Sequence, residues 1–161
     1  MNNRPQNKNI YEYSLKRQFI GRIGDDSVHY QIKNPESVAD YLKSIDFHAD
    51  EQENMVVLFL DVRNQIKGYQ MVTRGLADRS HVHPREIFRS AIIAGSAKII
   101  LAHNHPSGDT SPSSQDKVAT QNLIDAGKIL SVKVIDHIVV GEKAGVFNFT
   151  SLRSSSDIDW K

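Results

Sequence analysis

Apolar residues occur along the chain in short continuous runs, and these runs predict the strands of a sheet. Residues 55–60 (MVVLFL) form a run of the length typical of a buried strand. Residues 61–64 predict a turn, and residues 65–73 predict a second strand that completes a hairpin with the first. Later strands are predicted at residues 97–102 and 131–140, followed by a turn at 141–145 and a short return strand at 146–149.

Apolar stripes at helical spacing predict three helices. The first begins at Pro35, because Asn34 is a favourable N-cap residue and proline suits the first helical position. The second begins near Pro84 and ends at Gly95, and the third begins at Ser113. The predicted inner faces are Val38, Tyr41, Leu42 and Ile45 in the first helix, Ile87, Phe88, Ala91 and Ile92 in the second, and Val118, Leu123, Ile124, Ile129 and Leu130 in the third.

The alternation of strands and helices predicts an α/β (α+β) fold, in which helices flank a mixed β-sheet. A chain of 161 residues is long enough to bury the core of one domain. We expect this domain to span residues 35–150. It would be preceded by a partly disordered extension (1–34, with a strand at 10–20 and a turn at 21–26) and followed by a polar, exposed tail (151–161).

The composition narrows the classes of function. Lys and Arg number 20 against 19 Asp and Glu, so the near-neutral chain gives little electrostatic support for binding nucleic acid or a membrane surface. It contains no cysteine, which excludes disulfides, thiolate metal sites and a cysteine nucleophile. The polar N-terminus resembles no secretory signal, and no apolar run approaches the ~20 residues of a membrane span. We therefore expect a cytoplasmic protein.

The chemistry of the chain is concentrated where the apolar run at residues 98–102 ends. His103 and His105 follow it, and residues two apart on an extended segment point to the same face. Pro106 favours that extended conformation for His105. Asp116, at the start of the third helix, could fold back to complete a two-histidine, one-carboxylate metal site. Such a site with an open position is typical of hydrolytic zinc centres.

Each part of this pattern also has a purely structural interpretation. The histidine pair alone could be polar loop residues or a satisfied core histidine. Ser113 and Asp116 have the spacing of a capping box, although a cap does not prevent Asp116 from binding a metal. A second pair, His81 and His83, runs directly into a helix start, which favours a position for His83 near the cap.

Three other histidine-based metal chemistries do not fit the sequence. A zinc deaminase would need a pair of cysteines, and the chain has none. The His-Glu-x-x-His helix motif is absent. A binuclear hydrolase built on a TIM barrel would need roughly 250 residues.

The string HNHPSGDTSPSSQD at residues 103–116 resembles the motif of a known family. Its His-x-His, seven residues and Ser-x-x-Asp resemble the JAMM (MPN+) signature of zinc metallohydrolases, and the full string resembles the RadC-like JAB domain. Thr110 stands where that family usually has proline. The resemblance extends over roughly residues 35–150, with further matching segments at 53–61 (ENMVVLFLD), 82–86 (VHPRE) and 136–141 (DHIVVG).

The resemblance implies a JAB/MPN-like fold with cytidine-deaminase-like layering and assigns a role to each motif residue. His103, His105 and Asp116 match the zinc ligands. Ser113 matches the serine that helps to stabilise the tetrahedral intermediate. Glu53, directly ahead of the first apolar strand, occupies the place of the catalytic glutamate, with Glu51 and Glu86 as alternatives. Asp136 is a candidate for holding a ligand histidine from behind, or else for a structural hydrogen bond.

The function implied by the resemblance is hydrolysis of a peptide or isopeptide bond in a protein or peptide substrate by a Zn²⁺ enzyme. RadC-like proteins have traditionally been called DNA repair proteins, so an accessory role beside nucleic acid is the main alternative. The near-zero net charge gives that alternative little support. A metal-free scaffold is a third interpretation, and the filled ligand positions argue against it.

Overall fold

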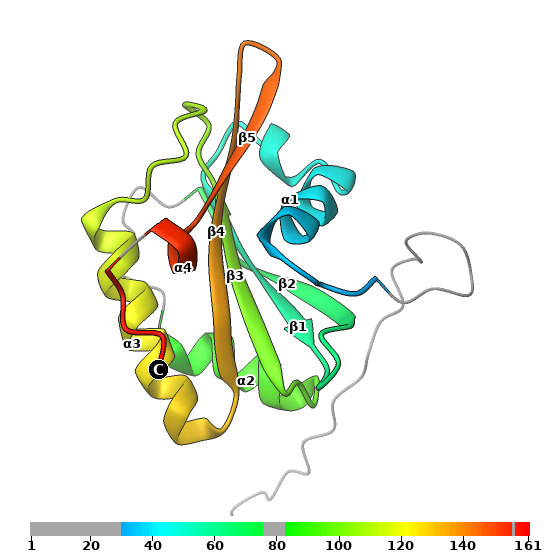
Figure 1. Cartoon of the computed structure of the whole chain (residues 1–161), viewed down its shortest axis with the longest axis vertical. Helices are drawn as coiled ribbons and strands as arrows, with labels where there is room; N and C mark the ends of the chain where they lie inside the picture. Colours follow the sequence, from blue (N-terminus) through cyan, green and yellow to red (C-terminus); the bar gives the residue numbers. More distant parts are fainter. Residues whose placement is uncertain (1–29, 76–82, 156) are drawn as a thin grey trace, which may run out of the picture.

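A five-stranded mixed sheet forms the centre of the computed structural model, which describes residues 30–75, 83–155 and 157–161 (Figure 1). The order of its strands is β2-β1-β3-β4-β5, in which β3 and β4 are parallel and the other pairs are antiparallel. The strands are β1 (Asn54–Leu60), β2 (Ile66–Arg74), β3 (Lys98–Asn104), β4 (Lys133–Lys143) and β5 (Val146–Ser151). The strand and turn expected within residues 10–26 lie outside the described residues.

Helices cover both faces of the sheet (Figure 1). Helix α1 (Pro35–Ser44) packs on one face, and α2 (Pro84–Ile93) and α3 (Ser114–Leu130) pack on the other. A short 3-10 helix η1 (Phe47–Ala49) follows α1, and α4 (Leu152–Ser155) follows β5. This mixed sheet with helices on both faces confirms the predicted α+β class and is consistent with a JAB/MPN-like fold. No helix among the described residues is both long enough and apolar enough to cross a membrane.

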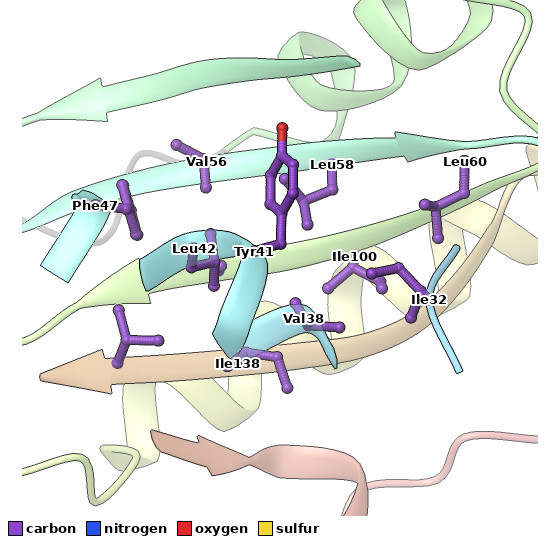
Figure 2. Packing of buried hydrophobic residues seen from close by; sticks show 12 residues of the cluster. Ile32, Val38, Tyr41, Leu42, Phe47, Val56, Leu58, Leu60, Ile100 and Ile138 are labelled. Atoms are coloured by element: carbon purple, nitrogen blue, oxygen red, sulfur yellow. The ribbon is translucent and has the colours of Figure 1, made fainter. Parts of the chain in front are cut away.

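Helix α1 begins where its sequence predicts. The side chain of Asn34 accepts a hydrogen bond from the backbone of Ser37, the Ser37 hydroxyl accepts one from the backbone of Asn34, and Pro35 occupies the first helical position. Figure 2 shows the apolar side of α1 lying against side chains of β1, β3 and β4. This cluster contains Val38, Tyr41, Leu42, Val56, Leu58, Leu60, Ile100, Ala102, Ile138 and Val140.

Side chains of the central strands alternate between two cores. On β1 and β3 the even-numbered residues, such as Leu58 and Ile100, face α1. The odd-numbered residues, such as Val57 and Leu101, face α2 and α3, where Ile87, Phe88, Leu123 and Ile124 meet them. This alternation decides on which side of the sheet every later residue of β3 lies.

The predicted inner faces of α2 and α3 are wrong in part. Ile92 is 55% exposed and Ile129 is 84% exposed, and Val118 and Leu130 are also exposed. In α2 the buried residues are Ile87, Phe88 and Ala91. In α3 the buried positions are Asp116, Thr120, Leu123, Ile124 and Gly127, so two of them are polar. A pattern search for apolar residues alone places this face incorrectly.

Three boundaries also differ from the prediction. Strand β3 continues through His103 and Asn104, because both pair with β4. Strand β4 continues through the predicted turn at residues 141–145 as far as Lys143, because β5 pairs with it along this length. The tail is not wholly exposed: Ser151 and Leu152 are buried, and Trp160 packs against the core on the side of α2 and α3.

Gly127 has a packing role that helix propensity does not predict. A Cβ there would lie 2.5 Å from the carbonyl oxygen of Val132 and 3.2 Å from Cζ of Phe88. The helix therefore approaches its neighbours more closely than any other residue would allow.

We expect Gly127→Ala to destabilise the protein by about 1–3 kcal/mol through overpacking, although the same change in an open helix would stabilise it by about 1 kcal/mol. Val118→Ala, at an exposed position of the same helix, is the control and should be neutral or slightly stabilising. Chemical denaturation measures both changes. An increase in the free energy of unfolding for Gly127→Ala would contradict this account.

Candidate metal centre

His103 and His105 converge at the end of β3. Both are buried, and their Nε2 atoms lie 3.0 Å apart. His103 is paired with Val139 in the parallel β3–β4 ladder, and the backbone N–H of His105 donates to the carbonyl of Val140 over 2.8 Å. The extended backbone between them turns both rings to the side of the sheet that α3 covers.

The loop after His105 lies flat on β4. The Nδ1 atom of His105 is 2.5 Å from the carbonyl oxygen of Asp109, which can only accept, so this nitrogen carries the proton. A Cβ on Gly108, which has a φ of 76°, would lie 2.4 Å from the carbonyl oxygen of Glu142. A Cβ on Gly141 would in turn lie 3.0 Å from the Cα of Gly108. Two glycines from separate motifs thus allow the loop to hold His105 with its Nε2 towards His103.

Asp116 reaches the histidines from the first turn of α3. Its Oδ2 accepts hydrogen bonds from the backbone N–H of Ser113 over 2.7 Å and from the Ser113 hydroxyl over 2.6 Å. The Ser113 oxygen accepts from the backbone N–H of Asp116 over 3.1 Å, which completes a capping box. The other carboxylate oxygen, Oδ1, lies 3.7 Å from Nε2 of His103. The cap and the approach to the histidines therefore coexist.

Glu53 lies beside the histidines because β1 and β3 are antiparallel. The register pairs Met55 with His103. Because the strands run in opposite directions, Glu53, two residues before Met55, comes opposite His105, two residues after His103. Ligand atoms of Glu53, His103 and His105 all lie within 4.8 Å of one another. The two alternatives are placed differently: Glu51 is exposed, and Glu86 on α2 forms ion pairs with Arg85 and Arg89 at 3.1 and 3.6 Å.

Asn104, between the two histidines, fixes the segment that carries Glu53. Its side chain faces the other side of the sheet and is fully buried. Its Oδ1 accepts from the backbone N–H of Asn54 over 2.7 Å, and its Nδ2 donates to the carbonyls of Asp50 and Gln52 over 3.1 and 3.0 Å. The sequence-based prediction missed this residue. The signal was available, because the residue between two side chains on one face of a strand points to the other face.

His137 on β4 stands behind His103. Its Nε2 lies 2.7 Å from Nδ1 of His103, and its Nδ1 lies 2.6 Å from the hydroxyl oxygen of Thr120 on α3. Burial lowers the pKa of His137 to about 4, against an opposing effect of Asp116 and with a smaller lowering by His105, so the ring is neutral at pH 7. Neither His137 nor Thr120 has a predicted role, since nothing in the local pattern connects them to His103.

Asp136, the sequence-based candidate for this supporting position, has the structural role instead. Its carboxylate accepts from the Ser151 hydroxyl over 2.8 and 3.0 Å and from the backbone N–H groups of His137 and Arg153 over 2.7 and 3.2 Å. Burial raises the pKa of Asp136 above its usual value, and these hydrogen bonds offset only part of that rise. These contacts anchor the end of β5 and the start of α4 to β4. Because successive residues of a strand face opposite sides of the sheet, Asp136 points away from the side on which His137 meets His103.

The donor set is one that a divalent metal ion could bind. Zinc bonds of about 2.0–2.1 Å in a tetrahedron separate neighbouring ligand atoms by roughly 3.4 Å. The Nε2 atoms of His103 and His105 are 3.0 Å apart, and Nε2 of His103 is 3.7 Å from Oδ1 of Asp116. These two distances lie on either side of the ideal value. Glu53 has a carboxylate oxygen within 4.8 Å of the ligand nitrogens of both histidines. Asp116 approaches these residues at His103. By geometry alone, either carboxylate could serve as the third ligand.

His83, from the competing histidine pair, does not belong to this group. His83 is the exposed N-cap residue of α2, as its sequence context indicated, and its side chain makes no capping hydrogen bond. His81 lies outside the described residues. Within the described part of the chain, Glu53, His103 and His105 form the group of possible ligands whose atoms all lie within 4.8 Å of one another.

Comparison with known proteins identifies the family. A UPF0758 protein of Methanosarcina acetivorans is 45% identical over 92 residues, which are 57% of this chain and 40% of that protein. A UPF0758 protein of Bacillus cereus is 39% identical over 129 residues, which are 80% of this chain and 55% of that protein. The chain thus spans about half the length of the curated relatives it matches. A sequence model of the RadC-like JAB domain matches residues 32–156, and the protein therefore belongs to the RadC-like JAB domain family.

Proposed function

We propose that this protein is a zinc-dependent hydrolase of peptide or isopeptide bonds. The observation that carries the proposal is the convergence of Glu53, His103 and His105 in one group, with Asp116 at its edge. Membership of the RadC-like JAB family supports the reaction class. Imidazole and carboxylate donors, without any cysteine in the chain, suit a borderline metal such as zinc.

In this proposal His103, His105 and Asp116 are the ligands and Glu53 is the general base. The environment of each carboxylate supports this division. Asp116 is buried, and one of its oxygens is committed to Ser113, which orients the other towards His103. Glu53 is only partly buried, so its carboxylate can exchange protons with water and substrate.

The bound metal would supply Lewis-acid chemistry, activating water and polarising the substrate carbonyl. Glu53 would accept a proton from the attacking water on a carboxylate oxygen and deliver it to the nitrogen that leaves. The Ser113 hydroxyl, which donates to Asp116 in this structure, would orient that ligand. Its family role in stabilising the tetrahedral intermediate would require the hydroxyl to turn towards the substrate.

The metal content of the protein tests the ligand assignment. The wild-type protein should bind about one zinc ion per chain, measured by elemental analysis after dialysis. Asp116→Ala should lose most of this zinc, because it removes one of three ligands. Asp125→Ala, at an exposed position of the same helix, is the matched control and should retain it. Equal zinc contents in the two variants would contradict the assignment of Asp116.

The role of Glu53 is separable from metal binding. Glu53→Gln should keep its zinc and lower the rate of cleavage by about 10²–10⁴-fold, because the amide cannot accept the proton. The measurement is a cleavage screen on peptide and isopeptide libraries with zinc-loaded protein. Glu51→Gln and Glu86→Gln are controls that should cleave like the wild type. Loss of zinc from Glu53→Gln would make Glu53 a ligand, and absence of cleavage by the zinc-loaded wild type would overturn the proposed reaction.

Asn104 should affect the rate through the position of Glu53. Asn104→Ala leaves the amide of Asn54 and two carbonyl groups without their partner, so we expect a loss of about 1–3 kcal/mol in stability. Zinc binding should persist, while cleavage slows and hydrogen exchange at residues 50–54 becomes faster. Asn148→Ala, at an exposed position on β5, is the control. Unchanged hydrogen exchange at residues 50–54 would contradict the role of Asn104 in holding this segment.

A further inference from the structure

A continuous chain of buried hydrogen bonds connects two of the proposed ligands behind the site. It runs from Nδ1 of His103 to Nε2 of His137 over 2.7 Å, and from Nδ1 of His137 to the hydroxyl of Thr120 over 2.6 Å. The Thr120 hydroxyl continues to the backbone carbonyl of Asp116 over 2.6 Å. His103, His137 and Thr120 are almost completely buried, so the chain is shielded from water.

The end of this chain decides the direction of every proton in it. The carbonyl of Asp116 can only accept, so the single hydrogen of the Thr120 hydroxyl is donated there. Thr120 must then accept from Nδ1–H of His137. With its proton on Nδ1, the His137 ring offers Nε2 as its acceptor nitrogen, and this atom faces Nδ1 of His103. His103 therefore donates from Nδ1, and its Nε2, which faces His105, carries the lone pair of the ring.

We propose that His137 and Thr120 are positioning residues that hold His103 in the Nδ1–H tautomer and so prepare its Nε2 to bind the metal. This inference rests on the proposed metal site. The metal-binding nitrogen of a histidine is set by the hydrogen bond of the other nitrogen, and such partners also increase the basicity of the ligand.

The same chain couples the two elements that supply the ligands. His103 belongs to β3 and Asp116 to the first turn of α3. The side chain of His137, from β4, bonds to His103 on one side and to Thr120 of α3 on the other. Because Thr120 bonds both to the carbonyl of Asp116 and to His137, a displacement of the helix start would also disturb His103. The ligands from strand and helix are thereby held in one arrangement before a metal arrives.

The tautomer can be measured without a metal. Long-range ¹H–¹⁵N correlation spectra of the zinc-free wild type should show His103 and His137 both protonated on Nδ1. Protonation of His103 on Nε2 would overturn the inference whether or not the protein is a hydrolase. Failure of zinc to bind, with Nδ1–H present on His103, would instead overturn the proposed metal site and the preparation of Nε2 for it, while the hydrogen-bond chain that sets the tautomer would stand.

Paired variants test the effect on the metal. Thr120→Val preserves the shape of the side chain but removes the hydroxyl, and it should weaken zinc binding by about 10–100-fold in a chelator competition. Thr120→Ser retains the hydroxyl and should bind zinc like the wild type. Equal affinities for folded Thr120→Val and Thr120→Ser would overturn the proposal.

A second pair covers the case in which Thr120→Val does not fold. His137→Gln can still accept a hydrogen bond from His103 through its amide oxygen, whereas His137→Leu cannot. The zinc affinity of His137→Gln should lie within a few-fold of the wild type, and that of His137→Leu should fall by about 10–100-fold. Equal affinities in this pair would exclude His137 as the partner that orients His103.

Discussion

The alternation of side chains along β3 is the constraint on which the rest of the site depends. His103 and His105 face α3, while Asn104 between them faces the opposite side and holds the backbone around Glu53. The antiparallel register of β1 brings Glu53 to the histidines. A shift of one residue in this register would turn both histidines towards the apolar core beneath α1. One strand register therefore places the histidines and the segment carrying Glu53 together.

Helix α3 combines two tasks along its length. Its second half contributes Leu123, Ile124 and the close approach at Gly127 to the core. Its first half presents Asp116 and Thr120 on the same inner face, where apolar residues would otherwise lie. Burying these polar groups is tolerable because each is hydrogen-bonded, Asp116 to Ser113 and Thr120 to His137 and a backbone carbonyl. The chemistry thus replaces part of the hydrophobic contact of the helix with a satisfied polar network.

Much of this arrangement could be predicted from local patterns. The apolar runs, the caps at Asn34 and Ser113 and the spacing of His103 and His105 all correspond to elements or contacts of the structure. The prediction was wrong where burial depends on neighbours distant in sequence. Ile92 and Ile129 are apolar yet exposed, because no element of the described chain covers that side of α2 and α3 sufficiently. The supporting residues His137 and Thr120 were missed for the same reason, whereas the alternation of side chains along β3 could have indicated Asn104.

The sequence by itself determined the class of fold, the family and the residues that converge at the end of β3, because these follow from short-range periodicity and from one compact motif. Only the tertiary structure decided which residues support that motif. Asp136 and His137 are adjacent, and their identities alone do not tell which faces the histidines. The sheet assigns Asp136 to the anchor of the C-terminal segment and His137 to His103. Hydrogen bonds between residues 17 and 34 positions apart have no signature in a local pattern, since they exist only once β3, β4 and α3 pack together.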